Sequence, residues 1–328
     1  MIDKIKYPLK FEPILKEKIW GGTKLKQLLA KNSTKNNIGE SWEISDVDSN
    51  ISVVSNGLWK GKTLKQLIQT FKGNLVGEKI YKQFGENFPL LIKFIDAKEA
   101  LSIQLHPNDA LAKKRHNSFG KTEMWYVMQA DKNANLIVGF KTEINKKQYL
   151  NHLNTQTLTD ILNIDLVKEG DVYFIPTGRV HAIGAGVLLA EIQQTSDVTY
   201  RIYDWNRQDD AGNYRDLHTE EALDALDLTA QKKYKTNYHQ NAKGSNKVVA
   251  CKYFTSNILF LDKEIKIDHT LKSSFVIYMC VSGEGVQFVS DDFEERLLYG
   301  ETILLPASIN KYSIIPIKDS KLLEIYIE

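Results

Sequence analysis

Short apolar or alternating segments dominate the chain, and most of them are bounded by glycine, asparagine, aspartate or proline. Examples are GESWEIS, FPLLIKFI, EMWYVMQA, DVYFIPTG, GVLLAEIQQ, SFVIYMCVSG and KLLEIYIE. Side chains along a β-strand alternate between the two faces of a sheet, so runs of this length and spacing are typical of strands. Many short strands separated by turns predict a mainly β protein, built as a sandwich or a barrel.

Helical periodicity is confined to a few stretches between the predicted strands. These stretches are 63–84, 108–116, 145–163 and 219–228. In the first, Leu64, Leu67 and Phe71 recur at the spacing of one helix face. In the last, Thr219 is the predicted N-cap, because two acidic residues follow it in the first turn. We expect short helical insertions on a β framework.

Two parts of the chain share a sequence pattern. The motif GDVYFIP, starting at Gly170, has the same Gly-acidic-x₄-Pro spacing as GETILLP, starting at Gly300. An aromatic strand precedes each motif, EMWYVMQA around Tyr126 and FVIYMCVSG around Tyr278. Repetition of this kind indicates two related β-barrels, of which only the first carries the longer helical insertions.

A polar segment without periodicity, QKKYKTNYHQNAKGSNK at 231–247, is the predicted linker between the two barrels. We therefore predict an N-terminal barrel with helical insertions over residues 1–235. A smaller C-terminal barrel is predicted over residues 236–328.

Composition and charge exclude several classes of protein. Hydrophobic residues make up 42% of the chain and charged residues 26%, which is typical of a folded globular protein and excludes disorder. The 43 basic and 41 acidic residues leave a formal charge of +2, so no overall field attracts nucleic acid or an anionic membrane. We expect neither as a partner, and the sequence leaves the oligomeric state open.

The cysteines and the amino terminus favour a cytoplasmic protein. Cys251 and Cys280 are too few for a disulfide scaffold and lie in no C-x-x-C motif. The first residues, MIDKIKYPLKFEP, mix charges and prolines where a signal peptide would need a continuous apolar core.

A polar face is predicted for the segment ALSIQLHP. Strand alternation puts its apolar residues on one side and Ser102, Gln104 and His106 on the other. Farther along, KTEMWYV places Lys121 and Glu123 two residues apart, directly before a strand that should be buried.

A third segment, DVYFIPTGRVHAI, places His181 just after an apolar strand and a turn. Two imidazoles and a carboxylate, from His106, Glu123 and His181, suit a divalent metal such as zinc with an open position for a substrate. Gln104 is a possible fourth, oxygen ligand.

The repeat supports a functional interpretation of these residues. Aligned on the aromatic strands and on the prolines, the second barrel has Phe275 opposite Glu123 and Lys311 opposite His181. The candidate ligands are therefore not needed to build a barrel. The other histidines are expected to be ordinary surface residues: His116, His152, His218, His239 and His269.

The segment LLAEIQQTSDVTYRIYDW carries Glu191, Asp197 and Arg201 among apolar residues. Read as a hairpin, it places Glu191 and Arg201 on neighbouring strands near the metal face. A buried arginine needs an anion, so Arg201 either forms a structural ion pair with one of these carboxylates or holds a substrate phosphate.

Four ordered motifs, SIQLHPND, KTEMWYV, GDVYFIPTGRVHAIGAG and EIQQTSDVTYR, resemble type I phosphomannose isomerases, zinc enzymes of the cupin superfamily. The resemblance extends from KFEPILKEKIWGG to the second barrel. The length of the chain resembles that of the compact bacterial members of the family. It implies two cupin-type jelly-roll barrels and one zinc ion per chain in the first of them.

The resemblance also implies roles for individual residues. Gln104, His106, Glu123 and His181 correspond to the zinc ligands, and Arg201 to an active-site arginine. The other matched positions belong to the sugar-phosphate pocket: Ser102, Lys121, Lys93, Glu40, Glu191 and Asp197. One position departs from longer members of the family, which have an aromatic residue where this chain has Ile183.

The implied reaction interconverts mannose 6-phosphate and fructose 6-phosphate through a cis-enediol, so the expected partner is a small sugar phosphate. Glu191, Lys121 and a metal-bound water are all chemically able to be the base. No G-x-G-x-x-G or P-loop motif indicates a nucleotide. The alternative functions are a non-enzymatic sugar-binding double cupin, a storage or scaffold protein, and an iron-dependent cupin oxygenase.

Overall fold

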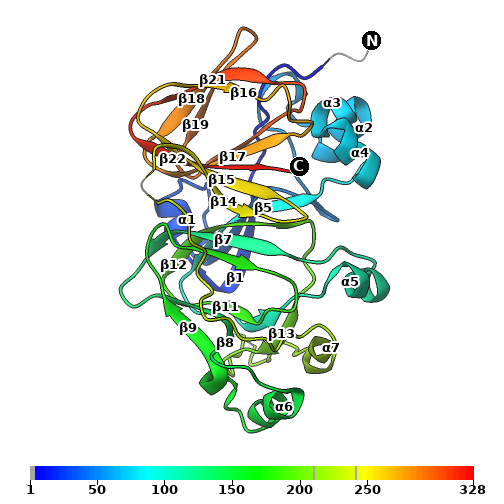
Figure 1. Ribbon diagram of the computed structural model, residues 1–328, viewed down its shortest axis with the longest axis vertical. Helices are drawn as coiled ribbons and strands as arrows, with labels where there is room; N and C mark the ends of the chain where they lie inside the picture. The colour runs from blue at the N-terminus through cyan, green and yellow to red at the C-terminus, as the bar shows by residue number, and fades with distance from the viewer. Residues whose placement is uncertain (1–3, 210, 241) are drawn as a thin grey trace.

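The computed structural model describes residues 4–209, 211–240 and 242–328. It is a mainly β protein of two jelly-roll barrels of the cupin type, which Figure 1 shows one above the other. The paired strands of both barrels are antiparallel, and each barrel is formed by two facing sheets. The predicted fold class is confirmed.

The first barrel is the larger. One sheet has the order β1 (Ile14–Gly22), β2 (Ile38–Ile44), β5 (Leu90–Ala97), β12 (Val187–Gln194), β7 (Glu123–Ala130), β10 (Val172–Ile175). The facing sheet has the order β13 (Tyr200–Tyr203), β6 (Ile103–Leu105), β11 (His181–Ile183), β8 (Asn135–Phe140), β9 (Leu162–Leu166). A small ribbon is formed by β3 (Asp46–Val47) and β4 (Asn50–Ile51).

The second barrel repeats this plan with shorter connections. Its first sheet has the order β14 (Gly244–Ala250), β15 (Thr255–Leu261), β22 (Ser320–Tyr326), β17 (Val276–Ser282), β20 (Thr302–Leu305). Its second sheet has the order β16 (Ile265–Asp268), β21 (Lys311–Pro316), β18 (Gly285–Val289), β19 (Glu294–Leu298). Since β22 lies between β15 and β17 as β12 lies between β5 and β7, the central strands of the two barrels correspond.

The core explains why the central strands are apolar on both faces. On β12, Leu188, Ala190 and Ile192 belong to a cluster that also contains Ile277 and Leu323 of the second barrel. The alternate positions of β12 face the interior of the first barrel. The two barrels therefore pack sheet against sheet, and the polar residues on the inward face of β12 point into the first barrel.

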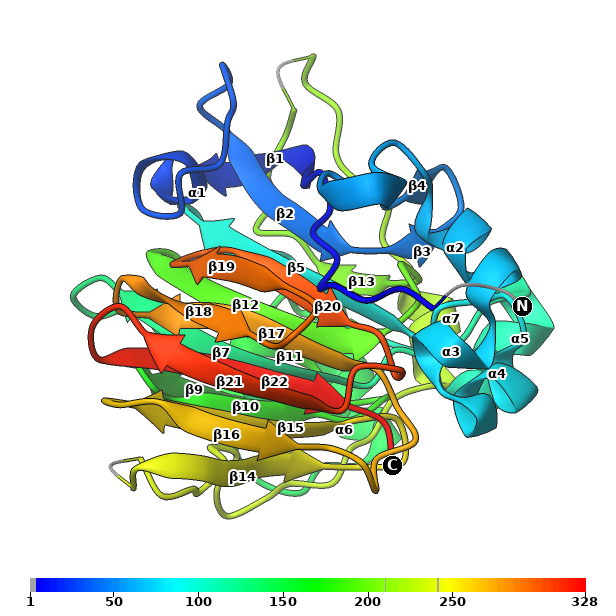
Figure 2. The same cartoon turned by 90° about the horizontal axis from the view of Figure 1, so that it is seen from above.

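The helical elements lie outside the sheets. Figure 1 shows α2, α3 and α4 grouped beside the second barrel, and α5, α6 and α7 at the lower right and bottom of the first barrel. In the view of Figure 2, α2, α3 and α4 again lie together, at the right-hand side of the molecule. Their bounds are α1 Lys24–Gln27, α2 Leu64–Phe71, α3 Gly73–Val76, α4 Glu78–Phe84, α5 Asp109–His116, α6 Lys146–Asn154 and α7 Thr219–Leu223, with 3₁₀ turns at Gly57–Trp59 and Leu158–Ile161.

The predicted helices are present, with differences at their ends. The stretch 63–84 is divided at Lys72 and Gly77, which both have positive φ. A Cβ atom on Gly77 would meet the carbonyl oxygen of Ser273 at 2.1 Å, so the second barrel lies directly against this break. The predicted N-cap Thr219 is instead the first residue of α7.

The N-cap of α7 is His218, whose backbone N–H donates to the carbonyl of Arg201 at 2.7 Å. The helix is also shorter than its 219–228 stretch, and the 145–163 stretch turns into β9 after α6. Pairing with β13 therefore decides where the chain enters α7.

The predicted boundary between residues 235 and 236 stays a prediction. Lys235 forms an isolated bridge with Tyr173 of the first barrel, and β14 begins at Gly244. The two predicted ranges also include residues 1–3, 210 and 241, which lie outside the described residues. No helix in the described part of the chain is both long and apolar enough to cross a membrane.

Candidate metal centre and cavity

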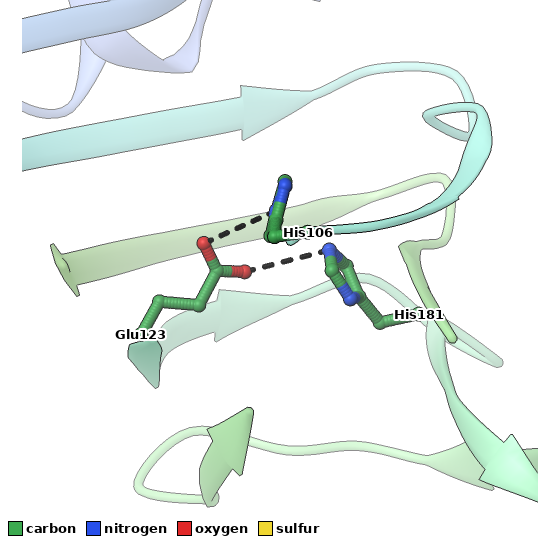
Figure 3. Close-up of side chains that lie close together, drawn as sticks. All are labelled: His106, Glu123 and His181. Atoms are coloured by element: carbon green, nitrogen blue, oxygen red, sulfur yellow. Dashed lines mark ion pairs between the residues drawn. The ribbon is translucent and has the colours of Figure 1, made fainter. Parts of the chain in front are cut away.

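Three candidate ligands converge inside the first barrel. His106 follows β6, Glu123 begins β7 and His181 begins β11. The Nε2 atom of His106 lies 3.6 Å from Glu123 Oε2, and His181 Nε2 lies 3.5 Å from Glu123 Oε1 (Figure 3). The donor atoms of the three residues lie within 4.8 Å of one another, and all three side chains are buried.

The second nitrogen of each imidazole determines its protonation. His106 Nδ1 lies 2.9 Å from the carbonyl oxygen of Val198, and His181 Nδ1 lies 2.8 Å from that of Arg179. A carbonyl oxygen only accepts, so each Nδ1 carries the proton and donates it. Each Nε2 therefore carries a lone pair that points toward Glu123. Metal-binding histidines have the same arrangement, in which one ring nitrogen donates a hydrogen bond to the protein and the other is available to the metal.

Burial keeps the two imidazoles in the neutral form that binds a cation. It lowers the pKa of His181 to about 4 and that of His106 well below 6.5, so both imidazoles are neutral. Burial and the Glu191 carboxylate raise the pKa of Glu123. Among the described residues, His106 Nε2 and both Glu123 oxygens are buried without a hydrogen-bond partner. Acceptor atoms that converge in this way fit a divalent cation between them.

Gln104 lies beside this group. On β6 it is opposite His181 of β11 and Arg201 of β13 in the strand register. Its side-chain amide nitrogen lies 3.4 Å from His181 Nε2, and its amide oxygen accepts from Ser102 Oγ at 3.3 Å. The predicted polar face of this strand thus points into the barrel.

The site opens into a cavity of about 210 Å³. All the other predicted pocket residues line it: Glu40, Lys93, Ser102, Gln104, Lys121, His181, Glu191, Asp197 and Arg201. The structure therefore brings the whole predicted set together, with His106 and Glu123 adjoining the cavity through His181. A second cleft of about 930 Å³ shares Asp197 with it but contains none of the three converging residues.

A row of alternating charges crosses one wall of the cavity. Lys93 Nζ lies 3.1 Å from Glu191 Oε1 and 3.9 Å from Glu40 Oε2. Burial acts to raise the pKa of Glu40, but Lys93 and Lys18 lower it to about 2. Burial also acts to raise the pKa of Glu191, but Lys93 and Lys121 lower it. Burial acts to lower the pKa of Lys93, but Glu191 and Glu40 raise it. The three groups are therefore all ionised.

Sequence reasoning missed several residues of this cavity. Tryptophan side chains hold the two carboxylates, since Trp42 Nε1 donates to Glu40 at 2.6 Å and Trp125 Nε1 donates to Glu191 at 2.8 Å. The missed lining residues include Lys18, Trp20, Trp42, Trp125, Thr199 and Arg215. Strand alternation could have indicated Trp42, which shares a face of β2 with Glu40.

The hairpin predicted for Glu191 and Arg201 is wrong. Glu191 lies on β12, which pairs with β5 and β7, whereas Arg201 lies on β13, which pairs with β6 in the facing sheet. The segment between them crosses from one sheet to the other, so the two side chains approach the same cavity from opposite walls. Adjacent strands in the sequence need not pair when the chain changes sheets.

Arg201 forms no ion pair with a carboxylate among the described residues. Its Nε donates to Ser102 Oγ at 3.3 Å, and its Nη1 donates to the carbonyl of Asp216 at 2.8 Å. Burial and the nearby Arg215 guanidinium lower the pKa of Arg201. Arg215 is bound to Asp204 through its Nε at 2.7 Å. Two neighbouring guanidinium groups on one wall favour an anion there.

The alignment of the two barrels differs by one residue from the prediction. Glu123 is opposite Ile175 of β10, and the corresponding partner of Leu305 of β20 is Val276, not Phe275. Lys311 itself is exposed, and its buried neighbour Tyr312 belongs to the core of the second barrel. Pairing between strands sets this register, which an alignment of aromatic residues did not capture.

His269 is also not the ordinary surface residue expected. Its Nε2 lies 3.2 Å from Oε1 of Glu324, a buried carboxylate that occupies on β22 the place of Glu191 on β12. Asn257 and Tyr278 donate to the same carboxylate at 2.7 and 2.9 Å. Within residues 4–209, 211–240 and 242–328, the group at His106, Glu123 and His181 is the one with three such metal donors.

Comparison with known proteins identifies relatives along nearly the whole chain. The family described as phosphomannose isomerase type I, catalytic domain, matches residues 9–142. The mannose-6-phosphate isomerase ManA of Bacillus subtilis is 32% identical over 310 residues, which cover 94% of this chain and 95% of that protein. The mannose-6-phosphate isomerase of Streptococcus mutans is 32% identical over 307 residues, covering 93% and 94%.

Solved structures agree with these sequences. The crystal structure of the Bacillus subtilis mannose 6-phosphate isomerase has a TM-score of 0.88 at 31% identity and covers 98% of this chain and all of that one. The apo form from Salmonella typhimurium has a TM-score of 0.77 at 15% identity over 99% of this chain. At that identity the second likeness shows the fold alone.

Proposed function

The chain belongs to the mannose-6-phosphate isomerase family of type I phosphomannose isomerases, and from that membership we propose a zinc-dependent interconversion of mannose 6-phosphate and fructose 6-phosphate. The proposed reaction moves one proton between C1 and C2 through a cis-enediol. The observation that carries the proposal is the buried group of converging donor atoms at His106, Glu123 and His181, which opens into a cavity lined by charged residues.

The zinc ion would be held by His106, Glu123 and His181, with Gln104 as the fourth ligand. When bound, such an ion polarises a carbonyl group and stabilises the negative charge that develops on its oxygen. Its redox inertness suits an isomerisation, which requires no electron carrier. The neutral imidazoles support this assignment, as do the Glu123 oxygens, which accept no hydrogen bond from the described residues.

The phosphate group is assigned to the wall formed by Ser102, Arg201 and Arg215. The Ser102 hydroxyl and the two guanidinium groups offer several donors to one dianion, and Arg201 is bound to the protein without a competing carboxylate. Arg201 also lies opposite Gln104 in the strand register, so its charge acts close to the metal group. We therefore assign it to catalysis as well as to binding.

Proton transfer is assigned to Glu191. Its lowered pKa keeps it as a carboxylate, and it lines the cavity, so it is able to take the C2 proton of the aldose. The resulting carboxylic acid returns the proton to C1, while the proton of the C2 hydroxyl group passes to O1, which gives the ketose. Lys121, 3.6 Å from Glu123 Oε2, supplies a positive charge beside the reacting oxygens.

The remaining polar residues bind the sugar. Glu40 and Lys93 lie in the charged row on the wall opposite Arg201, and Asp197 lies on the segment that joins the two walls. Their side chains are hydrogen-bond partners for the hydroxyl groups of the sugar chain. A cavity of about 210 Å³ is of the size that suits a small molecule rather than a polymer.

A coupled isomerase assay with mannose 6-phosphate tests the proposal. The protein is assayed as purified, after removal of metal by a chelator, and after addition of zinc or magnesium. We expect activity to disappear on chelation and to return with zinc. Metal analysis that finds only iron, or binding of the sugar phosphate without turnover, would instead support an oxygenase or a sugar-binding protein.

The role of Glu191 has a separate test. In heavy water, the wild-type enzyme should incorporate deuterium from the solvent at C2 of mannose 6-phosphate during turnover. The Glu191→Gln variant should bind the sugar phosphate and lose both exchange and isomerisation. Retained exchange in this variant would move the proton transfer to another group.

A further inference from the structure

Asp109, the first residue of α5, lies outside the cavity and joins three separate segments of the chain. Its Oδ1 atom accepts hydrogen bonds from the backbone N–H of Gly120 at 3.0 Å and from Gln194 Nε2 at 2.9 Å. Its Oδ2 atom accepts from the hydroxyl group of Tyr253 at 2.7 Å. One carboxylate thus binds the loop before β7, the end of β12 and the second barrel.

Gln194 extends this connection toward the metal centre. The side-chain oxygen of Gln194 accepts from the backbone N–H of Thr122 at 2.9 Å. The backbone N–H of Gln194 donates to the carbonyl of Thr122 at 3.2 Å. Thr122 lies between Lys121 and Glu123. The backbone that carries both of these side chains is therefore held directly by Gln194, and through Gln194 by Asp109.

Gly120 shows how closely this segment approaches α5. A Cβ atom at Gly120 would lie 2.7 Å from the backbone nitrogen of Asp109 and 2.9 Å from the carbonyl carbon of Asn108. Only glycine permits such an approach. The segment is packed against the first turn of α5 and fixed there by the Asp109 carboxylate.

Tyr253 brings the second barrel into this arrangement. It lies in the turn between β14 and β15, which is closed by a hydrogen bond from the Cys251 N–H to the carbonyl of Phe254 at 3.0 Å. Burial acts to raise the pKa of Asp109, but the hydrogen bonds from Tyr253, Gln194 and Gly120 lower it. All three donors therefore face an ionised carboxylate.

We propose that Asp109 is a positioning residue, which holds the backbone of Lys121 and Glu123 in place, and that Tyr253 couples the second barrel to the metal centre through it. The proposal rests on the metal site of the proposed function. It assigns the second barrel a role in the reaction, although the catalytic groups lie in the first. Loss of the carboxylate should loosen Glu123 without removing any ligand.

The direct measurement is zinc affinity, obtained by competition between the apoprotein and a chromophoric chelator. In Asp109→Ala we expect the dissociation constant for zinc to rise at least about tenfold, the usual effect of removing a group that orients a ligand. In Asp109→Asn, which keeps one acceptor oxygen, we expect a smaller rise. In turnover, kcat should fall while KM for the sugar phosphate changes little.

Tyr253→Phe tests the link from the second barrel. It removes one hydroxyl group, and we expect zinc affinity to fall about threefold, the effect of one ordinary hydrogen bond. The matched control is Tyr238→Phe, because the Tyr238 hydroxyl donates to the carbonyl of Gly170 at 2.6 Å and, among the described residues, forms no hydrogen bond with Asp109 or Gln194. Zinc affinity should be unchanged in the control.

A lower melting temperature with unchanged zinc affinity in Asp109→Ala would overturn the proposal, because it would show a purely structural role. If that variant does not fold, Tyr253→Phe decides, and zinc affinity equal to that of Tyr238→Phe overturns the coupling. If the wild-type protein fails to isomerise mannose 6-phosphate, the proposed function fails. The affinity measurements would still decide the role of Asp109.

Discussion

Glu324, at the centre of the second barrel, provides a test of the structure that is independent of the metal centre. Its carboxylate accepts hydrogen bonds from Asn257 at 2.7 Å and Tyr278 at 2.9 Å, and it faces His269 at 3.2 Å and Lys272 at 3.6 Å. Replacement by glutamine keeps the shape and removes the charge. The NH₂ group of the glutamine side chain would also face at least one of the groups that donate to the carboxylate.

The size of the effect follows from the pKa of this group. Burial acts to raise it, but His269, Lys272 and Asn257 lower the pKa of Glu324 from 4.5 to about 2. At about 1.4 kcal/mol for each pKa unit, the folded protein favours the ionised form by about 3 kcal/mol. Loss of hydrogen bonds to a buried charge costs a similar amount, about 1.5 to 3 kcal/mol each before relaxation. We expect Glu324→Gln to lower the free energy of unfolding by about 3 kcal/mol at neutral pH.

The same shift fixes the sign of the pH dependence. A carboxyl group whose pKa is lower in the folded protein contributes its stability above pH 4.5, and this contribution is lost as the pH falls toward 2. Between about pH 5 and about pH 3, the wild type should lose about 2 kcal/mol through Glu324. The Glu324→Gln variant lacks this part of the loss.

Urea denaturation followed by circular dichroism, at neutral pH and at about pH 5 and pH 3, measures both quantities. Glu284→Gln is the control, because the ion pair of Glu284 with Lys318 is exposed and should contribute less than about 1 kcal/mol. Zinc content and turnover at neutral pH should be unchanged in both variants. A Glu324→Gln protein as stable as the control, or one with the pH dependence of the wild type, would refute this account of the second barrel.

Three further predictions concern the first barrel. Removal of zinc by a chelator should abolish isomerisation and leave the circular dichroism spectrum largely unchanged, because two apolar cores remain; a joint collapse would indicate a structural metal. His181→Ala should reduce bound zinc well below one ion per chain and abolish turnover, and full activity with normal metal content would exclude His181 as a ligand. Arg201→Lys keeps the charge but loses the hydrogen bond to Asp216, so kcat should fall at least about 10²-fold. A rise in KM alone would make Arg201 a binding residue only.

Strand alternation made much of the site predictable from the sequence. The positions of Ser102, Gln104 and His106 on one face of a strand followed from a period of two, and the structure has all three beside the cavity or the metal group. Glu123 and His181 were predicted from another local pattern, since Glu123 stands directly before an apolar strand and His181 stands just after an apolar strand and a turn. The alternation of single strands is local, so it survives in any fold that contains them.

The pairing of strands could not be obtained in this way. The supposed hairpin of Glu191 and Arg201 assumed that consecutive strands pair, whereas the chain crosses between sheets after Gln194. The comparison of the two barrels slipped by one residue at Val276 for a related reason, since cross-strand hydrogen bonds set the register. His269 was placed at the surface because its partner Glu324 is distant in the sequence.

The sequence by itself determined which side chains face inward and which residue types are available for a metal and an anion, because strand periodicity and side-chain chemistry are properties of short segments. Only the tertiary structure decided which inward faces meet. His106, Glu123 and His181 come from three separate segments of the chain, and the contact of Asp109 with Tyr253 joins two barrels. Such contacts form because burial of both faces of the central sheets forces distant strands together, and no local pattern encodes that choice.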